Sequence, residues 1–171
     1  MGAVKFAGMD KQPQKSQAGV VPPEITVLYA SATGNAEELA AATAARLRAG
    51  GWPAAMANLA DFPAARLAET DTALLIASTW GEGAPPPDAA EFCAELDRAA
   101  GPRLPRLRYA VLALGSRSYR DFCGCGRRID EALARRGAVR LRARVDCDTK
   151  YKKDFQRWLA GVERILGRPP G

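Results

Sequence analysis

Three short segments of the chain combine hydroxyl groups, glycines and aromatic rings in a way that suits the binding of a small ligand. Residues 31–36 read Ser-Ala-Thr-Gly-Asn-Ala, and residues 78–81 read Ser-Thr-Trp-Gly. Residues 114–123 read Leu-Gly-Ser-Arg-Ser-Tyr-Arg-Asp-Phe-Cys. Each segment comes at the end of an apolar run, which is where a buried strand would finish.

The segment 31–36 has the residue types of an anion site at the start of a helix. Hydroxyl groups and free backbone N–H groups attract negative charge there, and the helix dipole adds to the attraction. Gly34 permits a close backbone turn. No lysine follows, so the segment differs from a nucleotide-triphosphate loop and suits a monoester phosphate. Taken alone, it is also consistent with an ordinary Ser- or Thr-capped helix.

Trp80 and Tyr119 are aromatic residues in the second and third segments, where a ring can stack on a planar ligand. Gly81 would let the backbone beside Trp80 approach that ligand. Singly, Trp80 is also consistent with packing between loops, and Tyr119 with an amphipathic surface position. Two rings together with a phosphate site favour a ligand that carries both a phosphate and a flat heterocycle.

Strands and helices are expected to alternate along most of the chain. Apolar runs predict strands at residues 25–30, 54–58, 72–78 and 109–114, and a fifth strand is expected at residues 139–145. Helical spacing of apolar residues predicts the intervening helices. Gly50 and Gly51 would end the first of them, Asp88 would cap one, and Asp148 or Thr149 would cap the last. This alternation indicates an α/β fold, a doubly wound parallel sheet with helices on both faces.

A doubly wound sheet binds its ligands beyond the carboxyl ends of its strands. The three segments follow the first, third and fourth strands, so all three are expected to meet at that edge. The candidate site residues that they contribute are Ser31, Ala32, Thr33, Gly34, Asn35, Ala36, Ser78, Thr79, Trp80, Gly81, Leu114, Gly115, Ser116, Arg117, Ser118, Tyr119, Arg120, Asp121, Phe122 and Cys123.

Length and composition fit a single domain of 171 residues. Residues 1–23 lack apolar periodicity and predict a flexible tail, residues 24–167 the domain, and residues 168–171 a tail or the start of a linker. No apolar run reaches the length of a membrane span, and the start of the chain does not resemble a signal peptide. We therefore expect a cytoplasmic protein with no membrane segment.

The residue types also limit the chemistry. The chain has no histidine, which excludes Ser-His-Asp and Cys-His nucleophiles. Cys123 and Cys125 are too closely spaced for the usual paired zinc ligands, and no metal site is expected. A disulfide is the alternative to ordinary thiols, and the composition favours ordinary thiols in a reducing compartment.

Charge is distributed unevenly along the chain. Residues 24–97 contain 3 basic and 11 acidic side chains, whereas residues 98–157 contain 17 basic and 6 acidic ones. The basic part is consistent with a solvated arginine-rich surface, with an acidic protein partner or with nucleic acid. Nucleic acid is the least favoured of the three, and we expect no nucleic-acid partner.

Taken together, the three segments resemble the FMN-binding loops of flavodoxin-like modules in diflavin reductases, above all the flavoprotein subunit of sulfite reductase. The resemblance covers about residues 25–166 and includes the segment 144–151 after the fifth strand. It implies a flavodoxin-like fold with strand order 2-1-3-4-5 and FMN as a non-covalent cofactor. It also adds Asp146 as a residue near that cofactor.

The resemblance assigns roles to particular residues. It implies that Ser31, Thr33 and Asn35 bind the phosphate and that Trp80 and Tyr119 flank the isoalloxazine. The backbone from residue 80 to 81 would contact N5 and reorient on reduction.

The chain departs from the family pattern in two places. Relatives often carry Tyr or Gln where Trp80 stands, and neutral or acidic residues where Arg117 and Arg120 flank Tyr119. These departures bear on redox potential and partner choice more than on FMN binding.

The expected function is the transfer of one or two electrons between an FAD/NADPH reductase module and a redox acceptor protein, for which the basic half suggests an acidic surface. The chain would be a stand-alone carrier or the FMN module of a multi-domain NADPH-dependent oxidoreductase. The alternative is an FMN-free flavodoxin-like interaction module. A receiver domain would need Asp where Ser78 and Thr79 stand, and a dinucleotide-binding domain would need a G-x-G-x-x-G motif.

Overall fold

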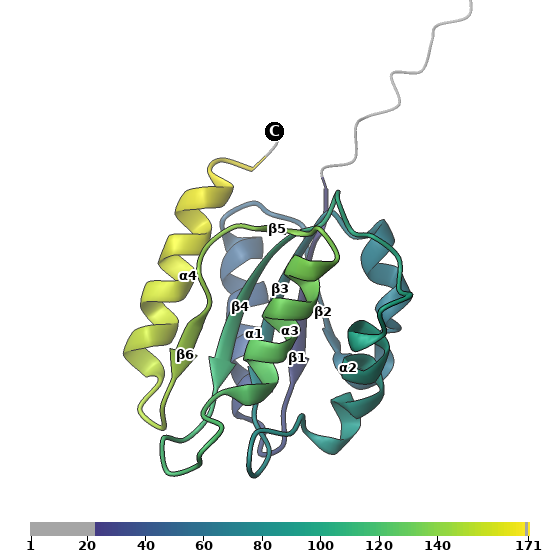
Figure 1. The fold of residues 1–171 in the computed structure, drawn as a ribbon. Helices are drawn as coiled ribbons and strands as arrows, with labels where there is room; N and C mark the ends of the chain where they lie inside the picture. The colour runs from purple at the N-terminus through teal and green to yellow at the C-terminus, as the bar shows by residue number, and fades with distance from the viewer. Residues whose placement is uncertain (1–22, 170) are drawn as a thin grey trace, which may run out of the picture.

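The computed structural model describes residues 23–169 and 171, so the predicted tail at residues 1–23 lies almost wholly outside the described residues. Within them the chain forms one parallel sheet with helices on both faces (Figure 1). Its strands are β1 (Ile25–Ala30), β2 (Ala54–Asn58), β3 (Thr72–Ser78), β4 (Arg108–Leu114), β5 (Val139–Arg140) and β6 (Val145–Cys147). Their order is β2-β1-β3-β4-β5, with β6 also paired to β4. The predicted flavodoxin-like order is confirmed.

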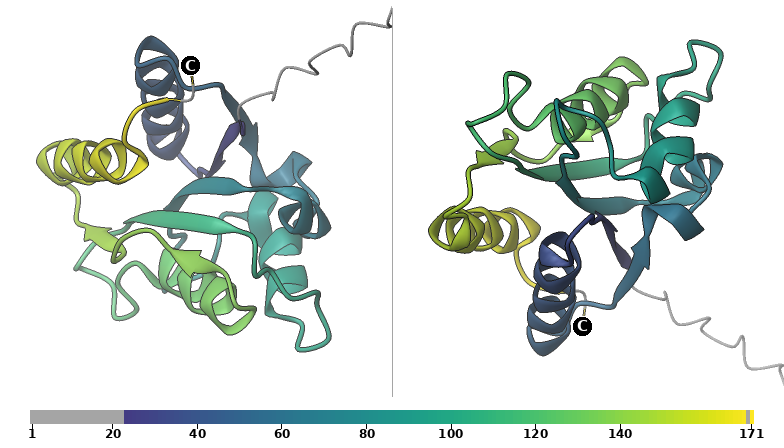
Figure 2. Two further views of the ribbon diagram at one scale, coloured as in Figure 1. Left: turned by 90° about the horizontal axis from the view of Figure 1, so that it is seen from above. Right: turned by 90° about the horizontal axis from the view of Figure 1, so that it is seen from below.

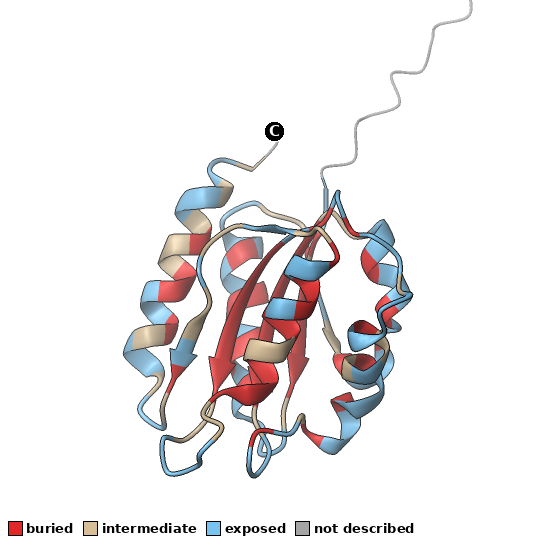
Figure 3. Ribbon diagram, viewed as in Figure 1, coloured by how far each residue is buried: buried red, intermediate tan, exposed pale blue. Residues whose placement is uncertain are grey.

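The central strand β3 shows why the sheet forms in this way. All seven of its residues are buried, as a strand of a sheet covered on both faces must be (Figure 3). It pairs in parallel with β1 up to Ala30↔Ala77 and with β4 up to Ser78↔Leu114. These registers end β1, β3 and β4 at the same edge, so the three segments that follow them start side by side.

Helices cover both faces of the sheet (Figure 2). One face carries α1 (Asn35–Ala49) and α4 (Lys152–Leu166), and the other carries α2 (Ala90–Asp97) and α3 (Gly124–Arg135). Three short turns of 3₁₀ helix complete the chain, η1 (Leu59–Asp61), η2 (Ala64–Glu69) and η3 (Pro87–Ala89). The buried residues of α1 include Ala36, Leu39, Ala40, Thr43 and Leu47, which share one face of the helix. Gly50 and Gly51 end this helix as expected, Gly51 with φ +89°.

The prediction of a continuous fifth strand over residues 139–145 is wrong. Tyr109 pairs with Arg140 in β5, and Leu112 pairs with Val145 in β6. The segment between Arg140 and Val145 is therefore two residues longer than the segment of β4 that lies opposite it. Arg140 and Arg144 flank this bulge and donate to the carboxylate of Asp130 on α3, at 2.8 and 2.9 Å. A buried carboxylate that needs two cations therefore accounts for the departure from a regular strand.

Two predicted helix caps are also wrong. Asp88 lies inside η3, and no side chain caps the start of α2. Asp148 accepts the N–H groups of Thr149 at 2.8 Å and Arg117 at 3.2 Å, while α4 begins four residues later at Lys152. Asp148 therefore joins two loops instead of capping a helix.

The cysteines Cys93, Cys123, Cys125 and Cys147 are all free thiols. Among the described residues, no helix has the length and apolar character needed to cross a membrane. Residues 23–169 and 171 also contain no group of three or more side chains arranged to hold a metal ion.

Asp130 provides a test of this architecture. Its side chain is 6% exposed and also accepts from the hydroxyl of Tyr109 at 2.9 Å. We expect Asp130→Ala to lower the free energy of unfolding by about 3 kcal/mol in urea denaturation, because it leaves two cations without their buried partner. The control Asp71→Ala removes an exposed pair with Arg106 and should cost less than about 1 kcal/mol. Equal effects of the two substitutions would contradict the buried network.

Candidate functional site

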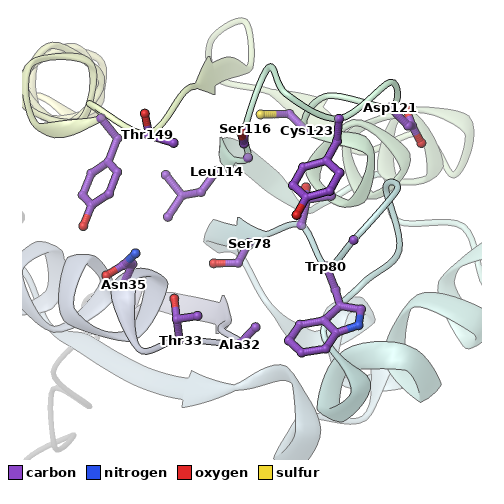
Figure 4. A pocket seen from close by; sticks show the side chains of 15 residues that line it. Ala32, Thr33, Asn35, Ser78, Trp80, Leu114, Ser116, Asp121, Cys123 and Thr149 are labelled. Carbon is purple, nitrogen blue, oxygen red and sulfur yellow. The ribbon is translucent and has the colours of Figure 1, made fainter.

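A pocket of about 600 Å³ lies beyond the carboxyl ends of β1, β3 and β4, at the edge where the three predicted segments meet. It is lined by Ala32, Thr33, Asn35, Ser78, Thr79, Trp80, Gly81, Leu114, Gly115, Ser116, Tyr119, Asp121, Cys123, Thr149 and Tyr151. Thr33 and Asn35 face Ser116 and Thr149 across it (Figure 4). The convergence expected from the strand order is therefore present.

Several predicted site residues do not line the pocket: Ser31, Gly34, Ala36, Arg117, Ser118, Arg120, Phe122 and Asp146. Most are chain neighbours of lining residues. Ser31 accepts the N–H of Gly34 at 2.9 Å and so shapes the turn before α1. Asp146 lies on β6, where its carboxylate pairs with Arg144 at 2.7 Å.

Sequence reasoning missed two lining residues, Thr149 and Tyr151. Both lie in the loop between β6 and α4, where Thr149 was expected only as a possible helix cap. The signal was available, because this loop also leaves a parallel strand at its carboxyl end.

The start of α1 lies at one end of the pocket. Its N-cap is Gly34, in the left-handed conformation with φ +93°, and no side chain caps the first turn. The first N–H groups of a helix have no acceptor inside the helix, so they stay available to a ligand. Thr33 and Asn35 line the pocket on either side of Gly34. This end of the pocket suits a phosphate.

The other end of the pocket carries two rings. Trp80 is 51% exposed and Tyr119 is 46% exposed, which is high for large aromatic residues. Trp80 belongs to a tight hairpin, in which its N–H donates to Ala84 O at 2.7 Å and Ala84 N–H donates back at 3.0 Å. Gly81 within it has φ +50° and open space where a side chain would begin. The ring and the adjacent backbone can both reach a ligand.

The floor of the pocket contains an unsatisfied polar group. Thr79 Oγ1 is buried and has no hydrogen-bond partner within residues 23–169 and 171. Such a group costs stability unless a ligand or water bonds it. Nearby, burial raises the pKa of the Cys123 thiol to about 12, so this thiol stays neutral near pH 7. The floor offers hydrogen bonding but no nucleophile.

Charged groups beside the pocket are mostly paired. Asp121 pairs with Arg127 and Arg128, and the hydrogen bond from Arg127 is the main cause that lowers the pKa of its carboxyl. Arg117 Nε lies 3.7 Å from Asp148 Oδ2. The pKa of the Asp148 carboxyl is lowered mainly by the hydrogen bond from the N–H of Thr149. These carboxylates are charged at neutral pH and held by partners, so none is free to act as a general acid.

The pocket thus joins a helix start that favours a phosphate, a floor with a hydroxyl in need of a partner, and two exposed rings. Its residues fit FMN, whose phosphate and isoalloxazine correspond to the two ends. They provide no acid, base or nucleophile, so any redox chemistry would come from the cofactor.

Comparison with known proteins agrees with this fit. The chain is 38% identical over 157 residues to the sulfite reductase (NADPH) flavoprotein alpha-component of Bacillus subtilis, an alignment that covers 92% of this chain and 26% of that protein. It is 38% identical over 145 residues to the corresponding protein of Neisseria meningitidis serogroup B, covering 85% and 24%. The chain therefore spans about a quarter of the length of these relatives.

Comparison with solved structures gives the same fold. A flavodoxin from Streptococcus pneumoniae TIGR4 superposes with a TM-score of 0.73 and 26% identity, over 84% of this chain and 97% of that one. The family model described as Flavodoxin matches residues 27–158. With that match extending from β1 into α4, the chain belongs to the flavodoxin family and binds FMN.

Proposed function

We propose that this chain carries one or two electrons between an FAD/NADPH reductase module and a redox acceptor protein. The observation that supports it best is the pocket, which joins the uncapped start of α1 to the exposed rings of Trp80 and Tyr119. The curated relatives are flavoprotein components of an NADPH-dependent reductase, and they are about four times as long as the aligned part of this chain. These likenesses support a module within such a reductase, or a carrier that serves one.

Different residues of the chain would contact the phosphate and the ring of the cofactor. Ser31, Thr33 and Asn35 would bind the phosphate together with the first N–H groups of α1. Trp80 and Tyr119 would cover the ring and keep water from it. FMN, when bound, supplies the one- and two-electron chemistry. An FMN-free interaction module is not favoured, because it would use the exposed rings but would leave the uncapped start of α1 and the buried Thr79 hydroxyl without a role.

Binding experiments can separate the two ends of the pocket. We expect FMN to bind the purified protein, as followed by quenching of flavin fluorescence. Thr33→Ala should weaken FMN binding about fivefold and leave riboflavin binding unchanged, since riboflavin lacks the phosphate. Trp80→Ala should weaken both ligands about tenfold, because the ring is common to them. A protein that binds neither ligand would contradict the proposed function.

The acceptor is proposed to be acidic where it docks beside Tyr119. Arg117 N–H donates to Asp148 at 3.2 Å, which joins the loop that carries Tyr119 to the loop between β6 and α4. These two loops and the start of α4 carry exposed cations that, within the described part of the chain, have no ion pair: Arg120, Lys150, Lys152 and Lys153. Such a surface attracts carboxylates and repels other cations.

Positive charge beside the ring should also raise the redox potential, because it stabilises the anionic reduced flavin. We expect the double variant Arg117→Gln, Arg120→Gln to have a two-electron potential about 30 mV more negative, which corresponds to a tenfold change in the equilibrium. Redox titration measures it. Arg106→Gln, at the other edge of the sheet beside Asp71, is the control and should leave the potential unchanged. An unchanged potential in the double variant would show that these arginines do not act on the ring.

Docking charge can be tested with two forms of one acceptor. Native cytochrome c is basic, and succinylation of its lysines makes it acidic without changing the haem. We expect the reduced protein to transfer electrons to the succinylated form about tenfold faster at low salt, with the difference shrinking as salt screens the charges. Stopped-flow absorbance gives both rates. Faster reduction of the native form would contradict an acidic acceptor, whereas no reduction of either would count against electron transfer itself.

A further inference from the structure

We propose that Arg128 is a positioning residue that fixes the Trp80 hairpin, residues 80–84, against the Tyr119 loop, residues 115–123. In doing so it would set the spacing of the two rings that flank the flavin. This inference rests on the proposed roles of those rings. It concerns a residue on α3 that does not line the pocket.

One guanidinium reaches both loops. Arg128 Nη2 donates to the carbonyl oxygen of Gly83 in the hairpin, and Nη1 donates to Asp121 Oδ2 in the Tyr119 loop at 3.0 Å. Asp121 comes two residues after Tyr119, so this contact acts close to the ring. A planar guanidinium with several fixed donors can hold two acceptors at a set separation, which an ammonium cannot do equally well.

The carboxylate of Asp121 fills the space between the two loops. A Cβ added to Gly83 or to Gly124 would overlap this carboxylate. Gly83 itself is buried and has φ +108°, a conformation that favours glycine. The hairpin, the carboxylate and the start of α3 are therefore in close contact, and Arg128 hydrogen-bonds both the hairpin and the carboxylate.

Other contacts hold the hairpin less firmly. Its base is fixed where Thr79 N–H donates to Leu114 O at 3.0 Å. Beyond that base, Arg120 N–H donates to Glu82 Oε2 at 3.3 Å, but both residues are exposed to water. The tip contains two glycines with positive φ, which leave its backbone free to adopt other conformations. Among the described hydrogen bonds to the hairpin beyond its base, the one from Arg128 therefore restricts the position of the Trp80 ring most.

The neighbouring Arg127 provides a matched control. It lies on the same helix and pairs with the other oxygen of Asp121 and, at 3.9 Å, with Glu131. It makes no hydrogen bond to the hairpin among the described contacts. Arg127→Gln and Arg128→Gln thus remove the same charge from the same carboxylate, but only the second releases Gly83.

The test compares FMN and riboflavin binding in the two variants. We expect Arg128→Gln to weaken both ligands about tenfold, since it acts on the rings, whereas Arg127→Gln should weaken them less than about threefold. Arg128→Lys keeps the charge but holds the two partners less well. Its loss of affinity for both ligands should lie between those of Arg127→Gln and Arg128→Gln. The visible circular dichroism of bound flavin should change in Arg128→Gln and not in Arg127→Gln, because it reports how the rings lie against the flavin.

The outcomes separate this inference from the proposed function. A wild-type protein that binds no FMN would contradict the function. If the wild type binds FMN, equal losses in the two Gln variants, or a loss for FMN without one for riboflavin, would overturn the positioning role. Thermal unfolding of the apo-proteins should be similar. If Arg128→Gln unfolds, Arg128→Lys supplies the decisive comparison, and riboflavin binding as tight as that of the wild type would overturn the role.

Discussion

The parallel pairing of β1, β3 and β4 is the constraint on which the site depends. The registers of these strands end Ala30 beside Ala77, and Ser78 beside Leu114. The phosphate end and the two ring-bearing loops therefore start from a common, fully buried edge. Backbone pairing sets this common base, so the loops that leave it can keep exposed rings and unpaired donors.

Much of this could be predicted from the sequence because the signals are local. The run of residues 73–77 is apolar throughout, and the helical spacing of Leu39, Thr43 and Leu47 is clear. The errors come from contacts between residues far apart in the chain. The bulge between β5 and β6 accompanies the hydrogen bonds of two arginines to Asp130. Asp148 accepts the N–H of Arg117 in another loop and does not cap α4. Thr149 and Tyr151 were missed because their loop carries ordinary helix-start residues and no glycine.

Several features of the pocket lower the stability of the protein in the absence of a ligand, and each involves a group that a ligand could contact. The first turn of α1 has no side-chain cap, and Thr79 Oγ1 is buried without a partner in the described structure. Trp80 and Tyr119 expose about half of their surface. Each of these features is unfavourable in the empty protein and is relieved by a group that supplies phosphate oxygens, a hydrogen-bond partner and an aromatic surface.

The ionisable groups around the pocket explain why it suits electron transfer better than acid–base catalysis. Asp121 and Asp148 are fixed by hydrogen bonds that keep them charged, while burial keeps the Cys123 thiol neutral. None of these three groups changes its charge near pH 7, so their own contribution to the electrostatic field at a bound ring would not vary with pH near neutrality. In the proposed carrier, a pH dependence of the potential near pH 7 would therefore come from the protons that the flavin itself takes up on reduction, and these three side chains would add none.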